Sequence, residues 1–310
     1  MASISIHDRL GSPAAERDVD LRKYFFESNV FDSIADASAT ILIGTRGAGK
    51  SAIFKIVGER EAKKGTAIVN ISPDEYSYEF MGTVLKSELE GVWAKQASFS
   101  ASWKYVLYIL AMREAVRYSR SSKTASFKAI SGYLQTNVQG ETKGIVEKLV
   151  SYMKRFEGLK LGSYELKGSA RALQKLYQLD EISNLLEPLR DVLANQKVYI
   201  FVDELDRGWD GSEDAKQFVA GLFQAAMQVN KLTPNLKIFI SLRRELFDNI
   251  PEIYDDIQKV RDLVRDVRWG EDELQELGSR LIISTTRPRP RDRLMRRNLR
   301  PVGHSVLRYV

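Results

Sequence analysis

The 310-residue sequence predicts an α/β protein with a doubly wound, mainly parallel sheet. Short β-rich apolar runs, which are typical of strands covered on both faces, occur at 40–44, 197–206 and 235–245. Helical segments alternate with these runs, and the glycine-rich stretch "GTRGAGKS" joins the first of them to a helix. Alternating strands and helices with right-handed crossovers form a parallel sheet between two helical layers.

The first elements are expected in the order helix, strand, helix, strand, helix. They cover 20–38, 40–44, 51–64 (ended by Gly65), 66–72 and, beginning at Pro73, 73–89. From 91 to 195 no core strand is expected. Helices are predicted at 103–118, 144–158 and 180–196, the last broken or bent by Pro188, with a small hairpin at 158–168. The stretch 124–144 has no clear assignment.

The remaining elements are a strand at 197–206, a helix at 213–230, a strand at 235–245, a short fifth strand at 264–269 and a helix at 270–283. The helix at 213–230 is expected to turn Phe218, Val219, Leu222, Phe223 and Ala226 inward. The last helix is expected to bury Leu274, Leu277 and Leu281. The chain is therefore divided into a lead-in and first core half (1–90), a mainly helical insertion (91–196), a second core half (197–283) and an Arg/Pro-rich tail (284–310).

Composition excludes several kinds of site. The chain has no cysteine and only two histidines, His7 and His304, which makes thiolate zinc sites and histidine dyads improbable. No apolar run approaches the roughly 20 residues that span a bilayer, and the N-terminus lacks an apolar signal core, so a cytoplasmic location without membrane contact is expected.

The net charge of +6 lies entirely in the tail. Residues 287–310 hold eight arginines and one acid, a net of +7, so that the rest of the chain sums to −1. This abrupt change of composition indicates either a basic disordered arm or a truncated or frame-shifted C-terminus, and we favour the second. In that case the basic charge is no evidence for binding of nucleic acid.

The stretch from Gly44 to Ser51 matches the phosphate-binding pattern G-x-x-x-x-G-K-[ST]. Its glycines allow backbone amides to converge on one point, and the following helix adds its positive end. We expect Lys50 to reach the β- and γ-phosphates of a nucleotide and the Ser51 hydroxyl to bind Mg²⁺. The loop residues that would surround the phosphates are Gly44, Thr45, Arg46, Gly47, Ala48 and Gly49.

Two acids end the strand "YIFVDELD". Asp203 stands where a carboxylate can hold Mg²⁺, and the next residue, Glu204, can orient or deprotonate a water that attacks the γ-phosphate. A small-molecule kinase usually avoids such a glutamate, because it would waste ATP on water. Asp206 and Arg207 are interpreted as a local ion pair in preference to contacts with the nucleotide.

A third polar group lies on "KIFISLRREL". Ser241 is the candidate polar residue near the γ-phosphate, and Arg243, ahead of Arg244, is the candidate to sense that phosphate or to stabilise the transition state. The alternative is that Ser241 is a hydrogen-bonded core hydroxyl and that both arginines are solvated at a helix start.

Four stretches in order, "ILIGTRGAGKSAIF", "VYIFVDELDRGW", "KIFISLRRELFDNI" and "VRDVRWGEDELQELGSRLI", resemble bacterial P-loop ATPases related to the KAP, STAND and origin-recognition-type AAA+ groups. The likeness covers about residues 15–283. It implies a three-layer P-loop NTPase with a five-stranded core of the additional-strand, catalytic-glutamate type. It also implies Walker A contacts from Lys50 and Ser51, a Walker B Asp203 for Mg²⁺, Glu204 as base and Arg243 as a sensor.

The resemblance implies ATP with Mg²⁺, since no Asn-Lys-x-Asp guanine-reading motif is present. Members of these groups often act in phage defence or mobile-element conflict, as switches tied to an effector. The expected function is therefore ATP hydrolysis that drives a conformational or assembly switch. The partners would be a protein that contacts the helical insertion and, by self-assembly, further copies of the chain.

Two departures from the resemblance bear on this expectation. The region between the Walker motifs lacks the membrane helices frequent in KAP proteins, and the helical lid of AAA+ relatives is only begun near residue 270. Two alternative functions stay open: a nucleic-acid-associated loader or translocase that uses the basic tail, and, less favoured, a P-loop small-molecule kinase.

Overall fold

The computed structural model describes residues 15–72, 92–119, 123–138, 179–207, 209–250 and 261–286. The chain divides into two compact units, one formed by residues 28–268 and the other by 1–27 with 269–310. The expected helices at 73–89 and 144–158, the hairpin at 158–168 and the tail from residue 287 onward lie outside the described residues. No helix within the described ranges is long and apolar enough to cross a membrane.

The larger unit is built on a five-stranded, all-parallel sheet, as the sequence predicts. Its strands are β1 (Ile41–Gly44), β2 (Ala67–Ile71), β3 (Val198–Val202), β4 (Leu236–Arg243) and β5 (Val264–Asp266). They lie side by side in the order β2-β3-β4-β1-β5, and every pair is parallel. The sheet therefore places β4 between β1 and β3.

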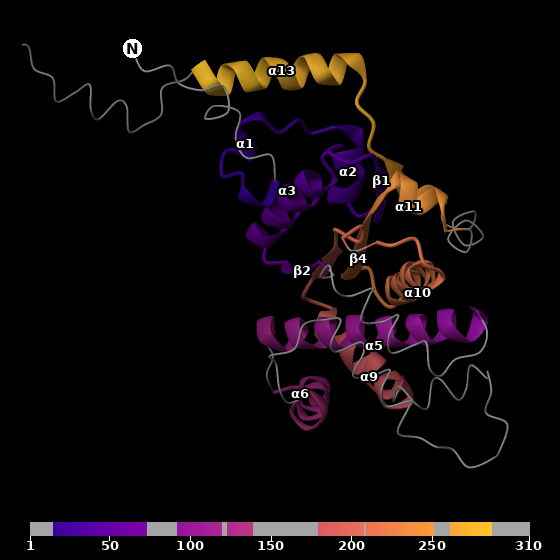
Figure 1. Ribbon diagram of the computed structural model, residues 1–310. Coiled ribbons are helices and arrows are strands. Elements are labelled where there is room, and N and C mark those ends of the chain that lie inside the picture. Colours follow the sequence, from indigo (N-terminus) through magenta and orange to yellow (C-terminus); the bar gives the residue numbers. More distant parts are fainter. Residues whose placement is uncertain are drawn as a thin grey trace, which may run out of the picture. The chain divides into compact units, whose positions relative to one another are not determined.

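One face of this sheet is covered by α2 (Asn29–Ala35) and α3 (Lys50–Lys63), which lie together in Figure 1. The Phe54 ring of α3 packs 4.9 Å from Phe201 of β3 and 6.4 Å from Phe239 of β4, and those two strand rings stack at 4.9 Å. Burial of these large rings anchors α3, and with it the loop at its N-terminus, to the middle of the sheet.

The opposite face is covered by α10 (Glu213–Val229) and α5 (Val92–Tyr118), with α6 (Ala125–Asn137) and α9 (Leu179–Leu193) packed beyond them (Figure 1). Trp103 and Phe99 of α5 meet Phe218 of α10 with ring centroids 5.0 and 5.6 Å apart. The Trp103 indole N–H donates to the Phe218 carbonyl at 3.3 Å. The α10 residues predicted to point inward are all buried.

Two helix predictions need correction, and two further helices, α6 and the short helix at 244–248, were not predicted. The helix expected at 20–38 is two pieces, α1 (Leu21–Tyr24) and α2, because the Ser28 hydroxyl caps a new helix by accepting from the Phe31 N–H at 3.3 Å. The stretch 124–144, left unassigned, contains α6, and α9 continues through Pro188 without a break. Residues 244–248 form the short helix α11 (Arg244–Asp248), and a 3₁₀ turn (Arg261–Leu263) precedes β5.

The smaller unit contains α1 and α13 (Glu271–Thr286). Arg280 donates to the Phe25 carbonyl at 3.0 Å and lies over the Phe26 ring. The prediction that α13 buries Leu274 is wrong, because this side chain is 52% exposed. In α13, acidic residues alternate with leucines that are spaced three or four positions apart. This pattern is compatible with a helix that buries only part of its apolar face within its own unit.

Candidate functional site

The predicted phosphate loop lies between β1 and α3. Gly47 and Gly49 have φ of 80° and 95°, in the left-handed region that glycine adopts without strain, and Gly49 caps α3. Gly44 is required for a different reason. A Cβ there would lie 3.1 Å from the Val267 carbonyl oxygen and 3.2 Å from its Cβ, closer than side chains normally pack. Thr45, Arg46 and Gly47 are exposed, whereas Ala48 is buried.

Lys50 folds back over its own loop. Its ammonium donates to the carbonyls of Gly44 and Thr45, each at 3.0 Å. Partial burial lowers the pKa of Lys50 from its ordinary value, and the charges of Asp203 and Asp206 act in the opposite direction. The loop lysine therefore lies within electrostatic reach of the acids that follow β3.

Asp203 is fixed at the end of β3. Its backbone N–H donates to Ile71 of β2 at 2.9 Å, and its carboxylate accepts from the Glu204 N–H at 2.8 Å. Ser51, in the first turn of α3, is half-buried. A hydroxyl and a carboxylate are oxygen ligands of the kind that Mg²⁺ takes when phosphates and water complete its shell. The described residues contain no cluster of three or more His, Cys, Asp or Glu that would hold a metal by themselves.

Glu204 departs from the strand conformation. Its φ of 60° is left-handed, which is uncommon and costly for a residue with a side chain and occurs most often at functional sites. The Glu204 carboxylate pairs with Arg207 at 2.8 Å. The predicted pair of Asp206 with Arg207 is thus wrong: Arg207 binds Glu204, and Asp206 binds Arg243 of β4. Adjacent side chains in a turn diverge, whereas those three positions apart can meet.

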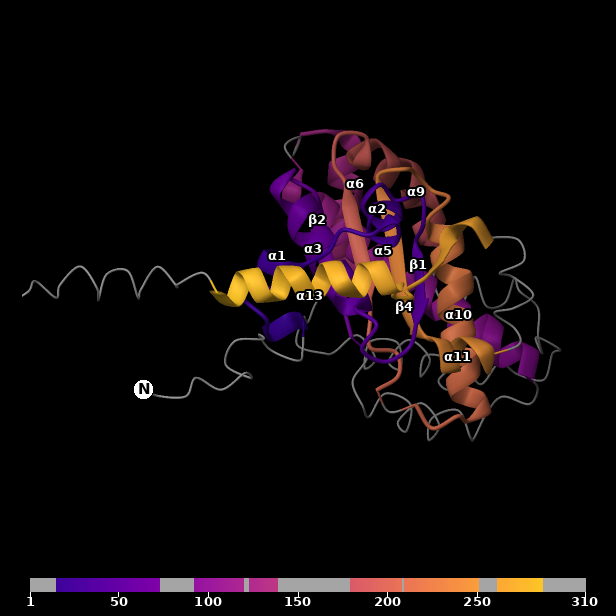
Figure 2. The same ribbon diagram turned by 90° about the horizontal axis from the view of Figure 1, so that it is seen from above.

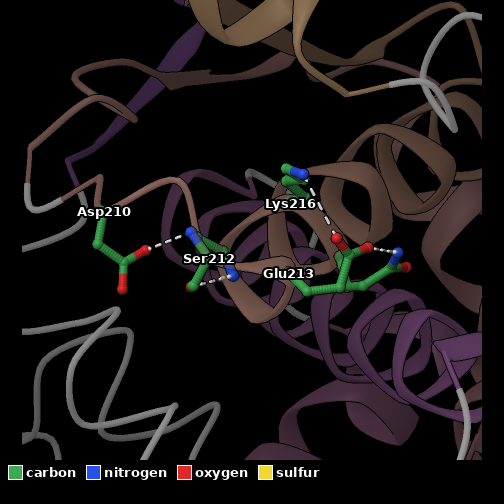
Figure 3. A network of polar contacts seen from close by, with 6 residues as sticks. Asp210, Ser212, Glu213 and Lys216 are labelled. Carbon is green, nitrogen blue, oxygen red and sulfur yellow. Dashed lines mark hydrogen bonds and ion pairs between the residues drawn. The ribbon is translucent and has the colours of Figure 1, made fainter.

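The segment that carries Asp203, Glu204 and Asp206 is also held by hydrogen bonds at its C-terminal end, where α10 begins. Figure 3 shows Asp210 accepting from the Ser212 N–H at 2.9 Å, and Ser212 in turn caps α10 by accepting from the Ala215 N–H at 3.2 Å. Glu213 holds Lys216 and Gln217 one turn further on. The segment between β3 and α10 therefore has both ends fixed, and its Glu204 and Asp206 lie between them.

Ser241 of β4 is a buried hydroxyl, only 2% exposed, and its Oγ has no hydrogen-bond partner in the described part of the chain. Among the described residues, Ser241 is therefore not the hydrogen-bonded core serine of the alternative. Ser241 pairs with Leu42 of β1, and it follows Ile240, which pairs with Val202 of β3. Ser241 therefore lies between the strand that leads to the loop and the strand that leads to Asp203, and Figure 2 shows β1 and β4 side by side.

The two arginines after Ser241 pair with different carboxylates. Arg243 lies beside Gly44 in the sheet and pairs with Asp206, whereas Arg244 pairs with Asp266 at the end of β5. Neither is a solvated arginine without a partner. Asp266 also binds Arg268 and was not identified from the sequence, although an acid at the end of the fifth strand was a usable signal.

Comparisons with known proteins give one distant relative. A protein of Escherichia coli (strain K12) with the name "Putative transposon gamma-delta 80.3 kDa protein" is 26% identical over 246 residues, covering 77% of this chain. The chain spans about a third of that protein, 34% of its length. No family model matches the sequence, and no solved structure matches it.

Proposed function

We propose that the chain is an ATP-binding P-loop ATPase that hydrolyses ATP to drive a conformational or assembly switch. The observation that carries this proposal is the position of β4. This strand inserts between β1 and β3 and carries a buried serine hydroxyl, without a hydrogen-bond partner among the described residues, between the glycine-rich loop and the Asp203–Glu204 pair. The additional-strand arrangement implied by the resemblance has this strand order.

The loop favours a polyphosphate. Gly47 and Gly49 permit the backbone to turn its amides inward, and a Cβ at Gly47 would meet nothing within 4 Å, which is open space on the loop. Lys50 is held by two carbonyl acceptors that a phosphate oxygen can replace without leaving a charge unpaired. Mg²⁺, which Ser51 and Asp203 would hold, offsets the charge of the β- and γ-phosphates.

In this proposal Glu204 accepts the proton of the attacking water. The water oxygen bonds to the γ-phosphorus, the bond to the β–γ bridging oxygen breaks, and ADP and phosphate are released. Lys50, Ser241 and Arg243 stabilise the negative charge on the transferred group. Because Glu204 pairs with Arg207 in the structure, the carboxylate has to leave this partner in order to orient water.

The name of the Escherichia coli relative refers to a transposon, which supports a role connected with mobile genetic elements. We propose that the described core is the ATP-driven part of such a system. Its effector would act through a protein partner or through assembly of several copies.

The test is ATP binding by calorimetry together with phosphate release. We expect Lys50→Ala to abolish binding, and Glu204→Gln to retain binding with turnover reduced at least about 100-fold, as for loss of a general base. Turnover that requires an added phosphate acceptor would favour a kinase instead. Salt-dependent DNA binding that is lost on deleting 287–310 would favour the nucleic-acid-associated alternative.

A further inference from the structure

The ion pair between Asp206 and Arg243 joins two elements of the candidate site that lie far apart in sequence. Asp206 belongs to the turn after β3, and Arg243 is the last residue of β4. Both side chains are partly exposed, with 20% and 30% exposure. Since Arg243 is the sheet partner of Gly44, the pair lies at the edge of the sheet where the loop begins.

The electrostatics of Lys50 independently place this pair near the loop. Asp206 raises the pKa of Lys50 and Arg243 lowers it, so that the lysine feels both members of the pair. Arg244 is held elsewhere by Asp266. Arg243 is thus the arginine of β4 that can exchange a carboxylate for a phosphate close to Lys50.

We propose that Asp206 is a positioning residue for Arg243: it holds the guanidinium beside the loop until the terminal phosphate of ATP takes its place. Because the carboxylate competes with the γ-phosphate for Arg243, Asp206 limits the preference of the site for a nucleoside triphosphate over a diphosphate. This inference rests on the proposed function and adds to it the carboxylate that competes with the γ-phosphate for Arg243.

Replacement of Asp206 by phosphate at Arg243 also affects the position of Glu204. Arg207, next to Asp206, donates its backbone N–H to the Glu204 carbonyl at 3.0 Å and its guanidinium to the Glu204 carboxylate. A turn released from Arg243 carries Arg207 and Glu204 with it. Recognition of the triphosphate is thereby coupled to release of the carboxylate that orients water.

The experiment measures ATP and ADP affinities by calorimetry with Mg²⁺ on the full chain. Asp206→Asn keeps the size of the side chain and removes its charge, so that ATP no longer competes with a carboxylate for Arg243. We expect the ratio of ATP to ADP affinity to rise about fivefold, from the upper range of energies of partly exposed ion pairs. Asp206→Glu should restore the original ratio.

The matched control is Glu245→Gln. Glu245 is exposed and its charge also acts on Lys50, but within the described ranges the ion-pair partner of Arg243 is Asp206 and not Glu245. Its loss should strengthen ATP and ADP binding alike and leave the ratio unchanged. In an Arg243→Gln background, Asp206→Asn should no longer alter the ratio, because the guanidinium that it positions is gone.

An unchanged ratio in Asp206→Asn, or a rise that persists without Arg243, overturns the inference while the ATPase proposal stands. A wild-type chain that binds neither nucleotide overturns the ATPase proposal itself and the inference with it. Thermal unfolding of each variant separates these outcomes from a failure to fold.

Discussion

Removing the hydroxyl of Ser241 should stabilise the protein and impair its function. The Oγ is buried and has no hydrogen-bond partner in the described ranges. A buried polar group without a partner costs about 1–3 kcal/mol, and Ser241→Ala removes it while leaving a void smaller than a methyl group. We therefore expect the free energy of unfolding to rise by about 1 kcal/mol, or the Tm by about 2–4 °C.

The same substitution should weaken catalysis. If Ser241 donates to the γ-phosphate, its loss removes a hydrogen bond to a charged group, worth about 1.5–3 kcal/mol, and kcat/KM for ATP should fall at least about tenfold. Ser102 of α5 is the control, because its Oγ is also buried with no partner among the described residues but belongs to the helical layer opposite α3. Ser102→Ala should stabilise the protein and leave turnover unchanged.

Urea unfolding and phosphate release, measured on both variants, decide the matter. A loss of stability in Ser241→Ala with a gain in Ser102→Ala would show that the Ser241 hydroxyl has a partner in the folded protein. Unchanged kcat/KM in Ser241→Ala would refute its contact with the nucleotide, whatever the stability result.

Two further predictions concern helix packing and pH. Gly221→Ala should destabilise by about 1–3 kcal/mol in urea unfolding, because its Cβ would lie 2.6 Å from Phe99 Cβ, whereas Gly278→Ala, with nothing within 4 Å, should stabilise α13 by about 1 kcal/mol. Equal effects would contradict the packing of α5 on α10. Burial lowers the pKa of Lys50 from 10.5, so that ATP affinity should fall as the pH rises through the window below 10.5. In that window the unfolded lysine keeps a proton that the folded one has lost, and stability therefore rises with pH. Lys50→Arg, which stays charged, should show no fall in affinity over this window in calorimetry.

The strands β1, β3 and β4 were predictable because each is a short apolar run ended by a polar or glycine-rich turn. The helix α6 was missed because its apolar stripe is weak, although Thr124, which accepts from the Phe127 N–H at 3.2 Å, is a recognisable N-cap. The order of the strands could not be read from the residues, since parallel pairing is decided by packing between segments far apart. The expected domain boundaries stay predictions.

Within the candidate site, the glycine loop and the acids after β3 were identified because their spacing reflects local backbone geometry. The ion-pair partners were not, because Asp206 meets a residue 37 positions away and passes over its neighbour Arg207. Asp266 was missed for the same reason: it meets Arg244 only because β5 lies beside β1.

One face of β4 accounts for the contrast between the buried sheet and the polar site. Side chains alternate along a strand, so that Phe239, Ser241 and Arg243 share a face. Phe239 packs against Phe54 of α3, Ser241 is buried and has no hydrogen-bond partner in the ranges that the structure describes, and Arg243 pairs with Asp206. Along this face of β4, the three successive side chains therefore change from a packed aromatic ring to a hydroxyl and then to a charged guanidinium. A ligand that ends in phosphate oxygens, seated on the loop beside this strand, would satisfy the hydroxyl and the guanidinium together, whereas no group of the described chain bonds to the Ser241 hydroxyl.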